Sequence, residues 1–189
     1  MSLWDHLLAG RDPTRQWIAD PRTRIELDLD CCSLCGIRLN QPVENLSRLG
    51  PPDNLRPTHY EVYEYRKLGF SFDADRGVIT AFTVIFRPND TTPGMTGFSG
   101  TVLHAGRKIP LDSDTSEEQF VAEFGSPYWR EEEDDGEILD FYESGRIEWQ
   151  AEFCSDKTLD VLVVTTTPTL ADPEARQYFK VDKPWPPRS

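Results

Sequence analysis

The sequence predicts an α+β fold built from two related units, and three observations lead to this prediction. Apolar and polar residues alternate over residues 82–86 and 161–165, as is typical of strands. A helix-like segment precedes each group of strands and ends at a glycine followed closely by proline, at Gly50-Pro51-Pro52 and at Gly125-Ser126-Pro127. The same order of elements occurs twice, which indicates an internal duplication.

The first 24 residues are expected to form a helical arm. Residues 3–8 carry apolar side chains at helical spacing, and Gly10 with Asp12-Pro13 would end that helix. A second short turn would begin at Trp17 and stop before Pro21. We expect this arm, residues 1–24, to pack across the two units.

The first unit is predicted to span residues 25–90. Residues 25–30 alternate like a strand, and a short strand with Ile37 and Leu39 follows Gly36. A helical segment then carries Val43 and Leu46 on its apolar face. Three strand-like segments complete the unit, at residues 60–66, 69–72 and 78–86. Residues 91–100, rich in Gly, Pro and Thr, read as a linker to the next unit.

The second unit is predicted to span residues 101–167 and repeats this order. A short strand precedes a helix whose expected capping box pairs Thr115 with Glu118. Three strands are expected after it, at residues 138–142, 147–153 and 159–166. Residues 168–189 hold five prolines and would form a C-terminal arm. We expect one layer of antiparallel strands with the helices on one face.

Two tandem units of a helix and an antiparallel meander resemble the beta-lactamase inhibitor protein architecture. Single units of this kind look like the small outer-membrane assembly lipoprotein (SmpA/OmlA) domain. The resemblance covers about residues 36–166 and is carried by Leu49-Gly50-Pro51-Pro52 and Phe124-Gly125-Ser126-Pro127. We expect no signal peptide, lipobox or disulfides of those families here, and the chain looks more like uncharacterised cytosolic bacterial relatives, some of which are found among toxin-immunity proteins. The resemblance implies binding of a protein rather than catalysis, and transfers no functional residue.

The charge of the chain excludes two classes of partner. The formal net charge is −13, which argues against binding to nucleic acid or to an anionic membrane surface. Most of this charge is local, because residues 112–160 contain 17 acidic and three basic side chains. The N-terminus has no secretory apolar region, and three of the four cysteines lie within five residues. We therefore expect a reduced, cytoplasmic protein.

The acidic run that follows the second helix is the main candidate site. Its carboxylates would lie on a mobile loop and attract a basic protein partner. The aromatic side chains beside it would be anchors of the interface if they are exposed. The predicted site residues are Glu131, Glu132, Glu133, Asp134, Asp135, Glu137, Tyr128 and Trp129. The alternative is a solvated loop that only increases solubility.

Two chemical functions remain as alternatives to a non-catalytic interaction module. Glu148 and Glu152 flank Trp149 on a predicted strand and could serve a small carboxylate-dependent hydrolase. Cys32 and Cys35 form a CxxC that could bind a metal or act in redox chemistry. A structural zinc site needs four ligands, and no second CxxC or CxxH is present in the sequence. We therefore expect no cofactor, and the oligomeric state is not predicted.

Overall fold

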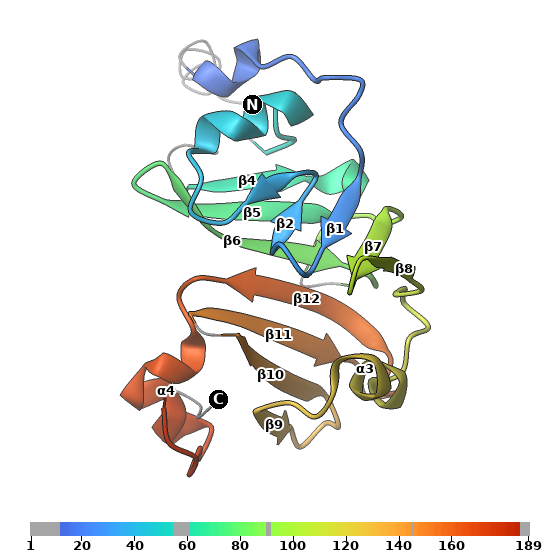
Figure 1. Ribbon diagram of the computed structural model, residues 1–189, viewed down its shortest axis with the longest axis vertical. Helices are drawn as coiled ribbons and strands as arrows, with labels where there is room; N and C mark the ends of the chain where they lie inside the picture. The colour runs from blue at the N-terminus through green and yellow to red at the C-terminus, as the bar shows by residue number, and fades with distance from the viewer. Residues whose placement is uncertain (1–11, 55–60, 90–91, 145, 186–189) are drawn as a thin grey trace.

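The computed structural model describes residues 12–54, 61–89, 92–144 and 146–185. The fold is α+β, as the sequence predicts, and two sheets account for most of it (Figure 1). The helix expected at residues 3–8 lies outside the described residues.

The large sheet has seven strands in the order β4-β5-β6-β12-β11-β10-β9, and all its neighbouring pairs are antiparallel. Strands β6 and β12 pair at its centre, where Thr83 lies opposite Val163. Figure 1 shows β4 and β5 above this pair and β11, β10 and β9 below it. The strands are β4 (Val62–Tyr65), β5 (Phe70–Asp75), β6 (Val78–Ile85), β9 (Trp129–Glu132), β10 (Ile138–Ser144), β11 (Ile147–Phe153) and β12 (Leu159–Thr165).

The small sheet corrects the expectation of a single antiparallel layer. Its five strands follow the order β3-β2-β1-β7-β8, and β1 runs parallel to β7, with Leu27 opposite Val102. The short strands that we expected at the start of each unit therefore belong to a separate sheet. The strands are β1 (Glu26–Asp28), β2 (Ser33–Leu34), β3 (Ile37–Arg38), β7 (Thr101–His104) and β8 (Arg107–Ile109).

Two tight hairpins build this small sheet. Cys35 and Gly36 join β2 to β3 with φ angles of 56° and 71°, and Ala105 and Gly106 join β7 to β8 with 51° and 68°. Positive φ at both central residues is the geometry of the two-residue turn that matches the twist of paired strands. Asp30 accepts the backbone N–H groups of Ala105 (2.9 Å) and Gly106 (3.0 Å), which ties β1 to the second hairpin.

The helices are few and short. Asp12-Pro13 begins a short helix, because the Asp12 carboxylate accepts the N–H of Thr14 at 2.9 Å. Trp17, where we expect a second turn to begin, instead caps the end of this helix, and Ile18 after it is 85% exposed. The 3-10 helices are η1 (Pro13–Gln16), η2 (Val43–Leu49), η3 (Arg66–Leu68) and η4 (Thr169–Ala171), and the α-helices are α3 (Glu117–Phe124) and α4 (Pro173–Tyr178).

The cap of α3 lies one residue later than predicted. Ser116, not Thr115, caps the helix, and its hydroxyl accepts the N–H of Gln119 while the Gln119 side chain accepts the N–H of Ser116. Thr115 is only 4% exposed, and its hydroxyl instead accepts the N–H of Asp112 at 3.0 Å. The local sequence Thr-Ser-Glu-Glu-Gln allows a capping box from either Thr115 or Ser116. The burial of Thr115 leaves Ser116 as the cap.

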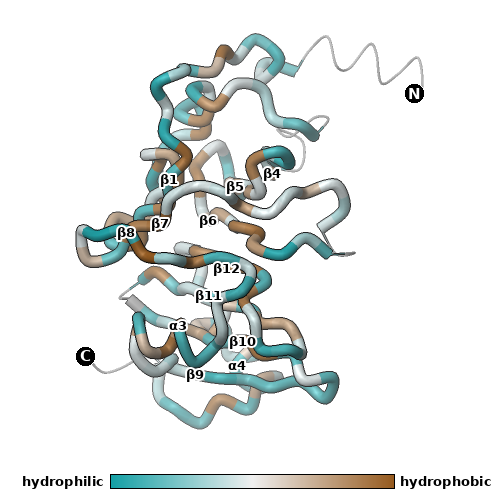
Figure 2. Tube along the Cα trace, turned by 90° about the vertical axis from the view of Figure 1, so that its right-hand side faces the viewer, coloured by the Kyte–Doolittle hydropathy of each residue, from teal (hydrophilic) through white to brown (hydrophobic). Residues whose placement is uncertain are grey.

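The core lies between the large sheet and the elements that cover it. Strand β12 reads Leu-Asp-Val-Leu-Val-Val-Thr and is buried at six of seven positions, as expected for a central strand. Figure 2 shows hydrophobic segments within the strands at the centre and hydrophilic segments in the outer turns. The largest fully buried side chains are the phenylalanines Phe70, Phe72, Phe82, Phe120, Phe141 and Phe153.

Candidate protein-interaction site

The acidic run forms an edge strand and a tight turn, which corrects the predicted loop. Glu131 and Glu132 lie in β9, the last strand of the described large sheet, opposite Leu139 and Ile138 of β10. The turn that follows closes through the N–H of Glu133, which donates to the carbonyl of Glu137 at 2.8 Å. Carboxylates on an edge strand also discourage pairing with other chains, so this placement has a structural use as well.

Most of the carboxylates of the run are exposed to solvent. Glu131 is half-buried, and Arg130 beside it forms an ion pair with Glu132 at 2.8 Å. The remaining exposed acidic residues have no ion pair with the described part of the chain. They are Glu133, Asp134, Asp135 and Glu137. The turn therefore presents negative charge that internal cations do not neutralise.

A pocket beside this turn gathers four acidic residues from three segments. Its volume is about 200 Å³. Ile138, Leu139 and Phe153 contribute apolar atoms to its lining. The acidic residues are Glu133 and Glu137 of the turn, Glu152 of β11 and Asp160 of β12. The last two come from outside the acidic run, and strand pairing brings them to it.

The acidic residues around the pocket give it a negative electrostatic potential. Burial and the neighbouring carboxylates of Asp160, Glu137 and Glu133 together raise the pKa of Glu152 to about 7, and burial is the largest cause. Burial also raises the pKa of Asp160, while a hydrogen bond from Asn89 opposes that shift. A bound cation would stabilise the ionised form of Glu152.

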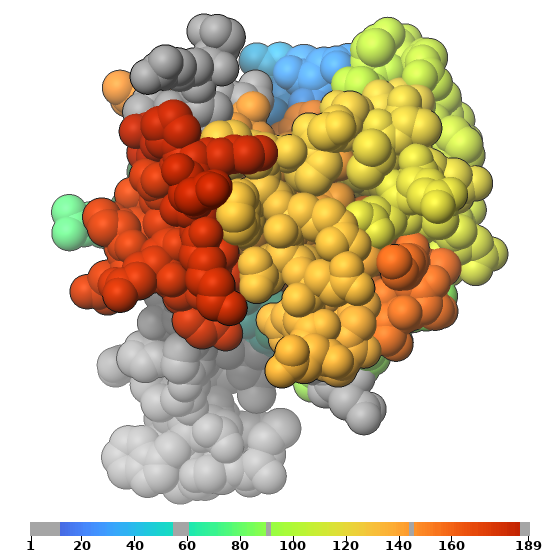
Figure 3. Space-filling model, turned by 90° about the horizontal axis from the view of Figure 1, so that it is seen from below, coloured from blue at the N-terminus to red at the C-terminus, as the bar shows by residue number. Residues whose placement is uncertain are grey.

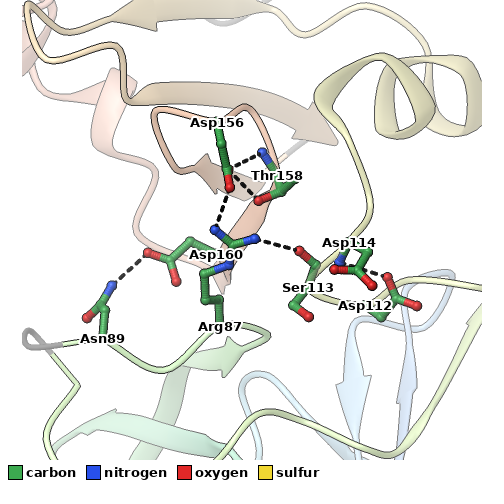
Figure 4. A network of polar contacts seen from close by, with 8 residues as sticks. All are labelled: Arg87, Asn89, Asp112, Ser113, Asp114, Asp156, Thr158 and Asp160. Carbon is green, nitrogen blue, oxygen red and sulfur yellow. Dashed lines mark hydrogen bonds and ion pairs between the residues drawn. The ribbon is translucent and has the colours of Figure 1, made fainter.

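A polar network holds Asp160 and the turn after β11 in place (Figure 4). The Asn89 amide donates to Asp160 Oδ2 at 2.7 Å, and Asp160 is only 9% exposed. Arg87 donates to Asp156 Oδ2 at 2.8 Å and to the carbonyl of Ser113 at 3.3 Å. Hydrogen bonds from Thr158 and Arg87 lower the pKa of Asp156 to about 2. This network positions one wall of the acidic pocket.

The predicted aromatic anchors lie beside the C-terminal segment. The Tyr128 hydroxyl donates to the carbonyl of Pro184 at 2.6 Å, and Lys183 Nζ donates to the carbonyl of Tyr128 at 2.6 Å. Trp185 contacts the Tyr128 ring, with 6.2 Å between ring centroids. Trp129 is half-buried. Figure 3 shows the C-terminal residues (red) and the β9–β10 region (gold) side by side on the lower face. Neither aromatic ring is a free anchor next to the acids.

The carboxylates of the hydrolase alternative do not share a pocket. Glu148 is fully buried and accepts the N–H groups of Thr169 (2.8 Å) and Leu170 (3.2 Å), so it joins η4 to the sheet. Glu143 lies opposite Glu148 in the sheet, and burial with the proximity of Glu148 raises its pKa to about 9. Glu152 lies in the acidic pocket instead. Sequence patterns did not single out Glu143, because the pairing that buries it is not local.

The cysteines of the CxxC lie in and before the first hairpin turn. Cys32 is 8% exposed and Cys35 is 3% exposed. Burial raises the pKa of both thiols, that of Cys35 to about 11, which disfavours the thiolate needed for metal binding or redox chemistry. Within residues 12–185, apart from the undescribed positions, no group of three or more His, Cys, Asp or Glu side chains is placed to hold a metal ion.

Comparisons with known proteins give two structural likenesses. No family model matches the chain, and no curated protein matches it. A DUF4309 family protein (YjgB) from Bacillus subtilis aligns over 65% of this chain and 75% of its own, with 14% identity and a TM-score of 0.41. An extracellular protein with an SCP domain from Bacillus anthracis aligns over 86% of this chain, with 12% identity and a TM-score of 0.48. The alignment spans 56% of that second protein.

The cytoplasmic location expected from the sequence is corrected by these comparisons. One of the two similar structures is that of an extracellular protein, which contradicts that expectation. We therefore withdraw the cytoplasmic location and assign none. No helix in the described parts of the chain is long and apolar enough to cross a membrane.

Proposed function

We propose that the chain is a non-catalytic interaction module, of the inhibitor or immunity type, that binds a basic protein through its acidic second unit. The acidic pocket is the centre of the proposed interface. It would take a lysine or arginine side chain of the partner, whose alkyl stem would lie against Ile138 and Leu139. The exposed carboxylates of the adjoining turn would attract the same partner over a longer range.

The gathering of four acidic residues around one pocket is the observation that carries this proposal. Burial is the main cause of the raised pKa of Glu152, and the three neighbouring carboxylates add to it, as expected where negative charges lie close together. A cation that enters the pocket gains from the negative potential of those carboxylates and relieves the repulsion among them. Binding at neutral pH should therefore release part of a proton from Glu152.

A titration with a defined basic peptide tests the proposal. The probe is Ac-Lys-Lys-Lys-NH₂, with Ac-Glu-Glu-Glu-NH₂ as its control, and calorimetry is run in buffers of different ionisation enthalpy. We expect binding of the lysine peptide that weakens at least tenfold between 0.05 and 0.5 M salt, with proton release. No binding, or binding that salt leaves unchanged, would contradict the proposal.

Two Glu→Gln variants locate the interface. Glu152→Gln removes the ionisable group of the pocket, and Glu118→Gln removes an exposed carboxylate on α3 outside the pocket lining. We expect the first variant to lose proton release and at least threefold in affinity, and the second to retain both. Equal losses in the two variants would assign the binding to overall charge rather than to the pocket.

We also propose that the two units are copies of one ancestral unit, with their helices on the same face of the large sheet. Matching hydrogen bonds at the two helix ends support this. The Tyr65 hydroxyl donates to the carbonyl of Gly50 at 3.3 Å, and the Tyr142 hydroxyl donates to that of Gly125 at 3.1 Å. Each glycine follows its helix with φ near 80°. Each tyrosine comes from the first strand of the three-stranded meander proposed for its unit.

Matching contacts at the two helix starts support the same proposal. Pro42, just before η2, forms an isolated antiparallel β-bridge with Val78. Ser116, just before α3, forms the same kind of bridge with Thr158. Equivalent backbone hydrogen bonds flank each bridge. In the first unit, Ile79 N–H donates to Gln41 O (2.9 Å) and Val43 N–H donates to Gly77 O (3.0 Å). In the second unit, Leu159 N–H donates to Thr115 O (2.9 Å) and Glu117 N–H donates to Lys157 O (3.0 Å). Partner interfaces need not be duplicated with the fold, because the acidic pocket uses residues of the second unit alone.

A further inference from the structure

The outer edge of β9 has backbone groups without a partner. The N–H of Glu133 donates to the carbonyl of Glu137, which directly precedes β10. Backbone groups alternate in direction along a strand, so those of Glu131 also face β10 and those of Arg130 and Glu132 face outward. No described residue forms a hydrogen bond with the backbone N–H or C=O of Arg130 or Glu132 on that outer side. The edge therefore offers these groups to another strand.

The opposite edge of the large sheet is closed by the chain itself. The N–H of Asp53 donates to the carbonyl of Glu64 in β4 at 2.7 Å. The Asn54 side chain accepts the N–H of Glu64 at 3.1 Å and donates to the carbonyl of Val62 at 2.9 Å. Strand β4 is thus bonded on both sides, and within the described residues β9 is the edge of this sheet that stays open to another chain.

The open edge is accessible and has defined ends. Arg130 and Glu132 are exposed, and Figure 3 shows the β9–β10 region (gold) on the face that is seen from below. At one end, Lys183 Nζ donates to the carbonyl of Tyr128 at 2.6 Å, so the C-terminal segment covers the chain just before β9. At the other end, the turn that begins at Glu133 closes onto β10. The free edge thus matches the four residues of β9.

The two faces of β9 differ in charge. Side chains alternate between the faces of a strand. On the face that carries α3, Arg130 binds Glu117 at 2.6 Å and Glu132 at 2.8 Å. The other face carries Glu131 and, after the strand, Glu133, and neither has an ion pair with the described part of the chain. The negative charge of the edge that internal cations leave unpaired therefore lies on this second face.

The acidic pocket lies on the face of Glu131. Leu139 is opposite Glu131 in β9 and opposite Glu152 in β11, and residues directly opposite each other in a sheet share a face. Leu139, Glu152 and Glu133 all line the pocket. A strand added outside β9 would therefore present every second side chain on the same face as the pocket.

We propose that the basic partner adds an antiparallel strand to the outer edge of β9, with lysines two residues apart opposite Glu131 and Glu133. This inference rests on the proposed function for the basic character of the partner, and it adds the form of the partner's backbone and the spacing of its charges. Backbone pairing selects an extended segment, and the side chains of the edge select its sequence. The intervening residues would lie opposite Arg130 and Glu132, and we expect them to be uncharged because a further cation would meet Arg130.

Charge disfavours a second copy of this chain at the same edge. An antiparallel pair of β9 strands would bring the acidic residues 131–135 of one copy close to those of the other. Like charges opposite each other destabilise a sheet, whereas lysines opposite the same carboxylates stabilise it. The carboxylates that discourage pairing between copies thus favour a basic strand.

Isomeric peptides test the spacing of the charges. Ac-Lys-Val-Lys-Val-NH₂ is the probe, and Ac-Lys-Lys-Val-Val-NH₂ has the same composition but places its lysines on opposite faces of a strand. In ¹H–¹⁵N spectra we expect the probe to shift the amide signals of Arg130 and Glu132 and to bind at least threefold more tightly than its isomer. Equal binding of the two would overturn the proposal. So would the absence of these shifts at about 10 mM probe, well above a weak Kd of about 1 mM.

N-methylated probes test the backbone pairing. In the proposed register the valine N–H groups point to β9, and the lysine N–H groups point away from it. Methylation of both valine nitrogens should abolish the amide shifts and weaken binding at least tenfold. Methylation of both lysine nitrogens adds the same bulk and should leave binding within threefold of the probe. Equal losses in the two peptides would overturn the proposal.

Two variants of the protein test the same hydrogen bonds from the other side. Glu132→Pro and Glu132→Ala both remove the carboxylate, but only proline removes the outward N–H. Proline is tolerated on an edge strand where its nitrogen faces solvent. We expect the proline variant to bind the probe at least fivefold more weakly than the alanine variant. Equal binding in the two would overturn the proposal, and the N-methylated probes decide it even if the proline variant fails to fold.

Glu152→Gln separates this inference from the proposed function. The variant alters the acidic pocket and leaves the backbone of β9 unchanged. We expect it to weaken Ac-Lys-Lys-Lys-NH₂ and to leave the preference for the probe over its isomer within twofold. If the lysine peptide does not bind while the probe still shifts the Arg130 and Glu132 amides, the proposed function fails and the strand pairing is supported. If the lysine peptide binds and the two isomers bind equally, only this inference fails.

Discussion

At the scale of single residues, the unusual feature is a set of buried acids without cationic partners. Asp140 is fully buried, and neither of its oxygens has a hydrogen bond from the described residues. Arg130 lies opposite Asp140 in β9, but its guanidinium binds Glu117 at 2.6 Å and Glu132 at 2.8 Å. Burial raises the pKa of Asp140 to about 7, and Glu117 adds to that shift. Below about pH 7, the folded protein therefore holds Asp140 mainly in its protonated, neutral form.

Stability should decrease as pH rises from about 4 to 8. The unfolded chain releases the Asp140 proton near pH 3.8, while the folded chain retains it until about pH 7. Between these values the folded state binds more protons, so its advantage declines as pH rises. Glu152, with a pKa of about 7, and Glu143, with about 9, act in the same direction.

Asp140→Asn tests this residue directly. The variant cannot ionise, so we expect it to raise the free energy of unfolding at pH 8 by on the order of 2 kcal/mol and to change it little at pH 4. Denaturant titrations at both pH values measure the effect. A stability gain that is equal at pH 4 and pH 8 would show that ionisation of Asp140 is not the cause.

The hydroxyl groups of Tyr65 and Tyr142 should contribute similar stability. Each donates to the carbonyl of the glycine that ends a helix, and each is at most 9% exposed. Tyr65→Phe and Tyr142→Phe should each cost about 1 kcal/mol, because each variant loses the hydrogen bond made by a buried tyrosine side chain. Thermal or denaturant unfolding measures both. No loss in either variant would remove one support for the duplication.

At the scale of elements, the cap of α3 decides where that short helix begins. The helix has eight residues, so its isolated stability is small and the Ser116 capping box matters. Ser116→Ala should cost about 1 kcal/mol at an unchanged denaturant slope, and Ser155→Ala, in an exposed turn, should cost almost nothing. Equal midpoints for the two variants would contradict this account.

The sequence predicts most elements but not which sheet each one joins. The stops at Gly50 and Gly125 are local, because a positive φ after a helix favours glycine whatever the surroundings. The separation of β1 and the two hairpins into a second sheet is not local, because it depends on the parallel contact of Leu27 with Val102, 75 residues apart. Alternation of apolar residues predicts a strand but not its neighbour.

At the scale of the whole molecule, the pairing of β6 with β12 joins the two proposed units into one sheet. Leu162 is fully buried and lies opposite Val84 at this junction. We expect the described sheet to unfold in one cooperative step, and Leu162→Ala to lower the free energy of unfolding by about 3 kcal/mol without creating a second step. Two separate transitions, seen by tryptophan fluorescence and circular dichroism, would show that the units unfold independently.

The sequence predicts the acidic residues of the candidate site but neither the strand on which they lie nor the pocket beside them. The sequence locates the acidic run, from which we expect a basic partner. The structure adds Glu152 and Asp160, which line one pocket with Glu133 and Glu137 of that run. The predicted anchor Tyr128 meets the C-terminal segment instead of solvent. Glu143 and Asp140 carry no sequence signal, because a carboxylate on a strand looks the same whether it is solvated or buried.

The sequence by itself determined the α+β class, the helix ends at Gly50 and Gly125, and the concentration of negative charge in residues 112–160. These follow from periodicity, turn residues and charge, which act over a few residues. The tertiary structure decided the division into two sheets and the assembly of the acidic pocket. These depend on contacts between distant strands and on burial, because desolvation and strand pairing arise only when the folded chain excludes water.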